Sequence, residues 1–390
     1  MTTTSTPVDP FAPATLGPLA LRNRVIKAAT FEGLTRKHVV NDRLVDFHRA
    51  VAAGGVGLTT LAYCAVSDDG CATPNEIVMK PEVVPGLAGL AEAVHAEGAA
   101  LSVQLGHAGA VAAATGHRGV SPSPVFSPLA MRRTRSIDAR GIARVVDDFG
   151  RAAGLVAEAG CDAVEVHLGH GYLLSEFLSP ALNRRSDGWG GSLENRARFP
   201  REVVQAVRSA VGDSVAVLVK LNMADGVPGG LWLDESVAVA RMLEDDGAAH
   251  ALVLTAGSSL QNPMYLFRGE APVEEMAATM PKFARPAFKL VGPRFLKSYP
   301  FEEAYLLPYA RQFRAALTMP LVLLGGINRR ETLQQAMDEG FEFVAMGRAL
   351  LREPALLRRW QAGDEGESLC VHCNKCMATI YRGTRCVLVE

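Results

Sequence analysis

The chain has 390 residues, more than one average domain, although a single barrel of about 250 residues with insertions reaches this length. Its 40 basic and 41 acidic residues leave a net charge of −1, and this balance argues against a nucleic-acid groove or a basic membrane patch. Hydrophobic residues make up 48% of the chain, which is enough for a buried core. No uncharged apolar run reaches about 18 residues and the start does not resemble a signal peptide, so we expect a cytoplasmic protein without a membrane partner.

A local pattern of helix end, glycine and short apolar run recurs along the chain. It appears at 52–61, 96–105, 158–167, 245–254 and 338–347. The glycine suits the left-handed position that ends a helix, and the apolar run suits a strand buried on both faces. Further apolar runs bring the expected number of strands to eight; they lie at 25–29, 215–221 and 320–324.

Amphipathic stretches lie between these runs and predict helices at 86–98, 142–160 and 193–211. The last stretch contains Pro200, which predicts a later start or a bend. Strands that alternate with helices indicate a parallel sheet, and eight such units favour an α/β fold of the TIM (β/α)8 barrel type. An open doubly wound sheet is the alternative.

Two stretches, 106–140 and 256–300, are too long for simple connections. They are interpreted either as functional loop insertions over the barrel mouth or as decoration. The expected organisation is a barrel domain over residues 1–365 and a short cysteine-rich tail over 366–390 that packs on it.

Barrel enzymes carry their chemistry where strands end, so we examined the residues at these positions. The predicted ends are rich in polar, cationic and glycine residues: Ala29, Thr30, Gln104, His167, Lys220, Gly325, Gly326, Gly347 and Arg348. The last two strands end in LLGGIN and AMGRALL. Glycines let backbone N–H groups approach a phosphate, and Arg348 adds a matching charge. The pattern therefore favours a phosphorylated cofactor, with tight turns and a surface arginine as the structural alternative.

After the fourth strand, HLGHGY places His167, His170 and Tyr172 together. Imidazoles donate hydrogen bonds to a carbonyl or oxyanion, and a nearby phenol can deliver a proton. A metal pair is the competing interpretation, but the run lacks the HExxH spacing and a third histidine. The three residues are predicted to be catalytic.

The segment HLGHGYLLSEFLSPALNRRSDGWGGSLENR resembles the Old Yellow Enzyme family of flavin-dependent NAD(P)H oxidoreductases. VQLGHAG at 103–109 and GRALLREP at 347–354 are further matches, and the likeness covers essentially the whole chain. The nearest branch is that of NADH:flavin oxidoreductases with 2,4-dienoyl-CoA reductase and trimethylamine dehydrogenase. The resemblance implies FMN across the barrel mouth, NADH or NADPH as reductant, and assembly into a homo-oligomer.

The resemblance also implies a role for each matching residue. Gln104 would contact the flavin ring, and the phosphate end would lie at Gly325, Gly326, Gly347 and Arg348. His167 and His170 would hold the acceptor's oxygen, and Tyr172 would protonate the α-carbon. The enzyme would thereby reduce an activated C=C bond of an enone or enoyl type. Hydride would pass from flavin N5 to the small-molecule substrate.

The chain departs from the family pattern at two positions. Lys220 stands where the family usually has arginine near the flavin's N1 and C2 oxygen, and it lacks the planar fork of arginine. After the first strand, AATFEG offers Thr30 or Phe31 near the flavin's C4 oxygen. We assign Thr30, with Ala29 beside it, to the cofactor site.

The tail contains CVHCNKCMATIYRGTRC, in which Cys370, Cys373, Cys376 and Cys386 form a set of four thiols. Their spacing resembles the ligand set of a [4Fe–4S] cluster, although relatives with clusters have a longer gap before the fourth cysteine. Structural zinc on the same thiolates and a metal-free tail stay open as alternatives.

The sequence leaves three further functions to weigh against C=C reduction. One is an amine or alicyclic-substrate dehydrogenase that passes electrons through an iron–sulfur cluster. Another is a flavin-free aldolase or isomerase that uses Lys220, which would leave the His167, His170 and Tyr172 run unexplained. A pure binding module fits least, because it needs no proton donor beside a phosphate site.

Overall fold

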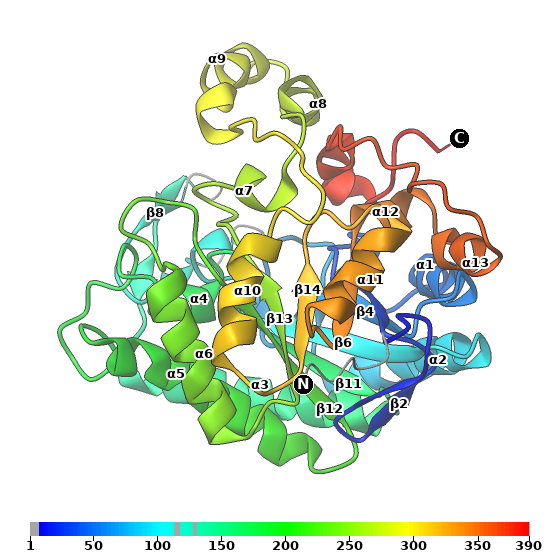
Figure 1. The fold of residues 1–390 in the computed structure, drawn as a ribbon. Helices are drawn as coiled ribbons and strands as arrows, with labels where there is room; N and C mark the ends of the chain where they lie inside the picture. Colours follow the sequence, from blue (N-terminus) through cyan, green and yellow to red (C-terminus); the bar gives the residue numbers. More distant parts are fainter. Residues whose placement is uncertain (1–7, 113–117, 128–130, 390) are drawn as a thin grey trace.

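The fold is built around a barrel of parallel strands. The computed structural model of the protein describes residues 8–112, 118–127 and 131–389. Within these ranges the barrel strands are β3 (Val25–Lys27), β4 (Leu58–Ala65), β6 (Ala100–Gly106), β11 (Ala163–Leu168), β12 (Ala216–Asn222), β13 (Ala251–Thr255), β14 (Leu321–Leu324) and β15 (Phe343–Met346). Neighbouring strands are parallel, and β3 pairs with both β15 and β4, which closes the barrel (Figure 1). The predicted TIM barrel is confirmed, and the open-sheet alternative is wrong.

Helices surround the barrel and follow its strands (Figure 1). They are α1 (Asp42–Ala53), α2 (Val84–Ala96), α3 (Ala139–Glu158), α5 (Leu193–Val211), α6 (Leu233–Asp246), α10 (Leu307–Ala316), α11 (Arg330–Asp338), α12 (Arg348–Arg352) and α13 (Leu356–Gln361). Glycine ends helices as predicted, for example Gly247 after α6 with a φ of 64°.

The prediction that Pro200 delays the start of its helix is wrong. Helix α5 begins at Leu193, and the side chain of Ser192 accepts a hydrogen bond from the backbone of Asn195. This cap fixes the start of the helix more than one turn before Pro200, and Pro200 is buried within the helix.

The barrel interior changes from apolar to polar along the strands. On β12, Ala216 and Leu218 face an apolar interior cluster, while Val217 and Val219 face the helices. A hairpin of β1 (Ala14–Leu16) and β2 (Leu19–Leu21) closes the N-terminal end of this cluster. Because inward positions alternate along each strand, the next inward position on β12 is Lys220. Polar inward side chains therefore lie at the C-terminal end, where the site forms.

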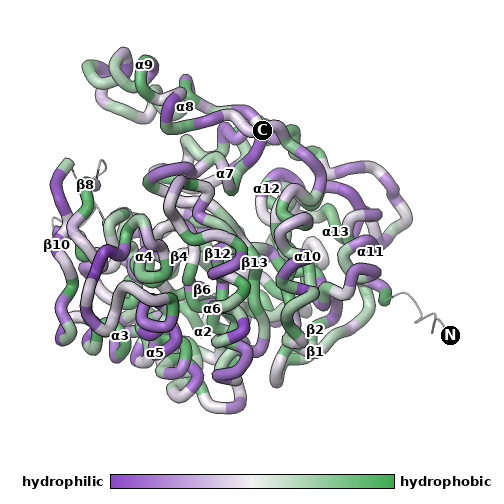
Figure 2. Tube along the Cα trace, turned by 60° about the vertical axis from the view of Figure 1, so that its left-hand side comes forward, coloured by the Kyte–Doolittle hydropathy of each residue, from purple (hydrophilic) through white to green (hydrophobic). Residues whose placement is uncertain are grey.

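The two long insertions carry short elements of their own. The described part of 106–140 contains η3 (Gly109–Val111) and two small strand pairs: β7 (Val120–Ser121) with β10 (Arg135–Ser136), and β8 (Phe126–Ser127) with β9 (Arg132–Arg133). The 256–300 stretch contains α7 (Met264–Phe267), α8 (Val273–Thr279) and α9 (Arg285–Phe295). Helices α8 and α9 project beyond the barrel mouth in both views (Figures 1 and 2).

The remaining short elements are η1 (Asp68–Gly70), β5 (Ile77–Val78) beside β4, η2 (Pro81–Val83), α4 (Leu173–Leu178) and, in the cysteine-rich tail, η4 (Lys375–Arg382). The η4 segment packs against α8 near the barrel mouth. In the described part of the chain, no helix combines the length and the apolar character that a membrane crossing requires.

Candidate active site

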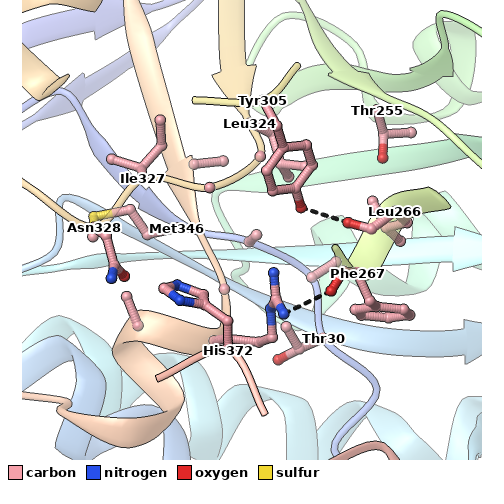
Figure 3. Close-up of a pocket in the computed structure, with 18 of the residues that line it drawn as sticks. Thr30, Thr255, Leu266, Phe267, Tyr305, Leu324, Ile327, Asn328, Met346 and His372 are labelled. Atoms are coloured by element: carbon pink, nitrogen blue, oxygen red, sulfur yellow. Dashed lines mark hydrogen bonds between the residues drawn. The ribbon is translucent and has the colours of Figure 1, made fainter. Parts of the chain in front are cut away.

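A cavity of about 650 Å³ opens at the C-terminal end of the barrel strands. Figure 3 shows its wall, with Thr30, Thr255, Tyr305 and His372 among the labelled side chains. Of the residues predicted from the sequence, the following line it: Ala29, Thr30, His170, Lys220, Gly325, Gly326, Gly347 and Arg348. Gln104, His167 and Tyr172 do not line it. Phe31, the alternative to Thr30, does not line it and packs against a buried cluster that contains Tyr63.

The turn after β14 is built for glycine. Gly325 and Gly326 have φ values of 110° and 78°, which side-chain-bearing residues rarely adopt. A Cβ atom at Gly326 would lie 2.6 Å from the ring of Tyr305, and one at Gly325 would lie 2.7 Å from Leu306. Helix α12 has only five residues, so the glycine turn and Arg348 are the stronger features for binding a phosphate.

Arg348 joins the cavity to two other segments. Its Nη1 donates to the backbone oxygens of Phe267 at 2.8 Å and Arg268 at 3.0 Å, and also to the side-chain oxygen of Asn374. The arginine therefore holds the end of α7 and the cysteine-rich tail against the barrel. These contacts argue against the interpretation of Arg348 as a surface helix residue.

His167, His170 and Tyr172 form one cluster beside the cavity. The ring centroids of His167 and His170 lie 4.9 Å apart, and those of His167 and Tyr172 lie 4.8 Å apart. His170 has a left-handed backbone with a φ of 62°, and its amide donates to the side chain of Asn222 at 3.1 Å. Its Nε2 lies 2.8 Å from the Thr255 hydroxyl. The turn thus aims one imidazole at the cavity and fixes its orientation.

Burial determines the protonation of this cluster. It lowers the pKa of His170 to about 3, with the charge of Lys220 adding to the effect, and it holds the pKa of His167 well below its usual value. Burial also raises the pKa of the Tyr172 phenol, while a hydrogen bond with Ser259 opposes the rise. At neutral pH the cluster therefore offers two neutral imidazoles and a protonated phenol. Nδ1 of His167 is buried without a hydrogen-bond partner among the described residues, which is unusual for a buried polar atom.

A buried ion pair lies on the floor of the cavity. Nζ of Lys220 donates to Glu165 Oε1 at 2.8 Å, and Nε2 of Gln104 donates to the same oxygen at 2.6 Å. Gln104 thus reaches the cavity through Glu165 and Lys220. A lysine held in an ion pair is a poor Schiff-base nucleophile, which argues against the aldolase alternative.

The four tail cysteines line one pocket of about 340 Å³, and Arg348 belongs to the wall of both this pocket and the cavity. All four thiols are free, and Nη1 of Arg352 lies 3.9 Å from Cys386 Sγ. Four thiolates around an iron–sulfur cluster leave a net negative charge, which the two guanidinium groups would offset. Within the described ranges, no three histidine, cysteine or carboxylate side chains are placed to hold a single metal ion. The thiol set, its common pocket and its cationic wall fit a cluster.

The tail is bonded to the loops that border the site. The amide of Thr384 donates to the backbone oxygen of Glu32 at 2.7 Å, and Nδ2 of Asn75 donates to the backbone oxygen of Tyr381 at 3.1 Å. Asn374, between two cysteines, donates to the backbone oxygens of Phe267 at 2.8 Å and of Glu270 at 2.9 Å. The end of the chain thus forms part of the barrel mouth.

Sequence reasoning missed several residues that shape the site. Glu165 could have been found, because it lies two positions before His167 and so faces the same side of the strand. Asn374 and His372 lie between cysteines of the tail, and no sequence signal connects them with Arg348 or the cavity. Thr255, at the end of β13, also lacks a sequence signal for its contact with His170.

Comparison with known proteins identifies the family. Residues 9–260 match the NADH:flavin oxidoreductase / NADH oxidase family. The chain belongs to this family. It is therefore an enzyme, an oxidoreductase that works with FMN and with NADH or NADPH as reductant on a small-molecule substrate, as the sequence resemblance implied.

Relatives within the flavin oxidoreductase family differ in length and in named substrate. The chain is 54% identical over 390 residues to 4,4'-dithiodibutanoate disulfide reductase of Rhodococcus erythropolis, covering 100% of this chain and 96% of that protein. It is 31% identical over 391 residues to the multifunctional alkene reductase/demethylase OYE of Caballeronia cordobensis, covering 96% of this chain but 52% of the relative. A solved 2-naphthoyl-CoA reductase complex has a TM-score of 0.81 at 24% identity, covering 97% of this chain and 56% of that one, which shows a shared fold.

The cavity fits the flavin cofactor of this family. It lies at the C-terminal ends of the barrel strands, the position at which barrel enzymes hold their ligands. The glycine turn brings backbone close to one end, where Arg348 supplies a positive charge for a phosphate. Lys220 lies on the cavity wall beside His170, where it would face the redox-active ring.

Proposed function

We propose that the chain is an FMN-dependent NAD(P)H oxidoreductase that reduces activated C=C bonds of the enone or enoyl type. The observation that carries the proposal is the cluster of two neutral imidazoles and a protonated phenol beside the cofactor cavity. Bound FMN supplies the hydride, which it regains from NADH or NADPH.

The residues of the chain polarise and protonate the acceptor. N–H groups of His167 and His170 bind the acceptor's carbonyl oxygen, and this makes the β-carbon electrophilic. As hydride arrives there, the electron pair of the C=C bond moves toward the oxygen, where the two imidazoles stabilise the developing charge. The Tyr172 hydroxyl then protonates the α-carbon, and its phenolate regains a proton from solvent. At the other end of the cavity, Gly325, Gly326, Gly347 and Arg348 bind the phosphate of the cofactor.

A second candidate reaction is reduction of an organic disulfide. The 54% identity to a disulfide reductase over the full chain favours it. Hydride delivered to one sulfur would form a thiol and break the S–S bond, and the electron pair would leave on the second sulfur as a thiolate. Tyr172 would protonate that thiolate. Cys71, which packs beside Tyr63 and Tyr172, is buried, and burial raises its pKa. A protonated, enclosed thiol is a poor nucleophile, so Cys71 is not expected to attack the disulfide.

The two acceptor classes are separated by kinetics of the FMN-loaded enzyme. We would reduce it anaerobically with NADH or NADPH and then mix it with 2-cyclohexenone or with 4,4'-dithiodibutanoate. For the acceptor that the enzyme uses, Tyr172→Phe is expected to slow flavin reoxidation by about 10²–10⁴-fold, the usual contribution of a general acid, while flavin reduction is unaffected. Reoxidation by the disulfide but not by the enone would replace the first candidate with the second.

Tyr63→Phe is the matched control for this experiment. Its ring centroid lies 5.2 Å from that of Tyr172, but its hydroxyl donates to the backbone oxygen of Gly70. This variant should leave reoxidation nearly unchanged. A protein that does not bind FMN, or a Tyr172→Phe variant that matches the parent with both acceptors, contradicts the proposal.

The cysteine tail carries a separate proposal, a [4Fe–4S] cluster held by Cys370, Cys373, Cys376 and Cys386. It is supported by their common pocket and by the two arginines beside it. If the cluster takes electrons from the flavin, the enzyme would run as an amine or alicyclic-substrate dehydrogenase. Iron and acid-labile sulfide in anaerobically purified protein test the cluster, and stoichiometric zinc or no metal would refute it. The barrel over 1–365 and the tail over 366–390 remain the proposed division of the chain.

A further inference from the structure

Glu165 occupies a central position beneath the cofactor cavity, although it does not line the cavity. The residue is 2% exposed, and its side chain lies inside the barrel on β11. The single atom Oε1 accepts hydrogen bonds from Gln104 on β6 and from Lys220 on β12, at 2.6 Å and 2.8 Å. The carboxylate thus connects three adjacent strands at the level where the barrel interior becomes polar.

We propose that Glu165 is a positioning residue that orients Lys220 and Gln104 toward the flavin and balances the charge of Lys220. The inference rests on the proposed cofactor site. Lysine carries its ammonium on a flexible four-carbon chain and has no planar fork to fix its direction. In the barrel interior, the Glu165 carboxylate supplies the fixed acceptor that this chain needs.

The same contact determines the net charge that the cofactor meets. Lys220 and Glu165 form an ion pair in which both side chains are nearly inaccessible, at 2% and 3%. Reduced flavin carries negative charge, which the ammonium stabilises and the carboxylate behind it partly cancels. Removing only the negative charge should therefore make reduction of the flavin easier.

Glu165→Gln separates charge from shape, because the amide oxygen can still accept a hydrogen bond. We expect the midpoint potential of bound FMN to rise by at least about 30 mV. For a two-electron couple, this rise corresponds to a tenfold change in the equilibrium constant for reduction. Because Lys220→Met leaves the carboxylate unpaired beneath the flavin, adding Glu165→Gln to Lys220→Met should also raise the potential above that of Lys220→Met alone. A merely structural role for Glu165 would leave the potential unchanged in both backgrounds.

Ser102→Ala is the matched control. Ser102 is a buried residue of the same barrel, on β6, and its Oγ has no hydrogen-bond partner among the described residues. This variant should leave the potential unchanged. The inference is overturned if Glu165→Gln leaves the potential of bound FMN where it was, in the parent or in the Lys220→Met background.

Glu165→Asp provides the test if Glu165→Gln does not fold. The shorter side chain keeps the charge but places the carboxylate one methylene farther from its partners, so the hydrogen bonds from Gln104 and Lys220 should be lost. FMN should therefore dissociate from this variant at least tenfold more readily than from Ser102→Ala. Unchanged FMN affinity in Glu165→Asp would refute the positioning role. Failure of the parent protein to bind any FMN would instead refute the proposed function.

Discussion

The proposal that His170 acts as a neutral hydrogen-bond donor predicts a large and specific loss when its side chain is removed. One donor to a developing oxyanion contributes about 3–4 kcal/mol, or roughly 10²–10³-fold in rate. His170 has a φ of 62°, a backbone conformation in which alanine is more strained than histidine, asparagine or glycine. His170→Gly removes the donor without that strain. His170→Asn tolerates the same backbone and restores a neutral N–H donor.

Stopped-flow reoxidation of the reduced enzyme by an enone measures this effect, with flavin reduction by NAD(P)H as an internal reference. We expect His170→Gly to be about 10²–10³-fold slower than the parent and His170→Asn to recover most of the loss. Burial lowers the pKa of His170 to about 3, so the parent rate should show no histidine inflection between pH 5 and 8. A charged donor would instead lose activity as the pH rises through its pKa. A parent-like rate in His170→Gly, or an inflection near pH 6.5 that His170→Asn removes, would refute the reasoning.

Three other predictions test the cavity, a buried acid and the tail. Gly326→Ala should weaken FMN binding and lower the Tm, because its Cβ would lie 2.6 Å from the Tyr305 ring at a φ of 78°; unchanged FMN titrations would contradict this. Burial raises the pKa of Glu176 to about 8, above the pKa that this residue has in the unfolded chain. The stability that the protonated Glu176 carboxyl contributes is therefore complete below about pH 4.5 and is lost as the pH rises to about 8. Glu176→Gln should therefore gain stability over the parent in urea unfolding between pH 5 and 9, by at most about 1.4 kcal/mol per pH unit, and an equal pH dependence in both proteins would refute it. Cys373→Ser should remove iron and sulfide from the tail while flavin absorbance remains, and an unchanged iron content would exclude Cys373 as a ligand.

The barrel could be predicted from the sequence because its signals are local and repeated. Each apolar run is long enough for a buried strand, and glycine ends the preceding helix, as at Gly160 and Gly247. Pro200 shows where local reasoning fails. The proline rule predicted a later start or a bend. The later start is wrong, because the Ser192 cap and the burial of the helix face fix the start at Leu193.

The candidate site was predictable only where strand ends reveal it. His170, Lys220 and the glycines line the cavity because inward positions at the C-terminal ends of parallel strands converge. Asn374 binds Arg348 across a sequence separation of 26 residues, and it reaches Phe267 across 107. Such contacts depend on how the tail folds back over the barrel mouth, and the spacing of the cysteines alone contains no information about it.

The position of Glu165 explains how a barrel interior can hold a lysine beneath a cofactor. An unpaired ammonium there would have lost its hydration without compensation, and an apolar replacement would leave the flavin without a cation. A carboxylate on the neighbouring strand compensates the buried ammonium and allows a cation to remain beneath the flavin. Parallel strands bring the two side chains within hydrogen-bonding distance, and the pair remains nearly neutral. Lys220 and Glu165 should therefore be regarded as one functional unit. Substitution of Lys220 alone would leave a buried, unpaired carboxylate, which would destabilise both the folded protein and the reduced flavin.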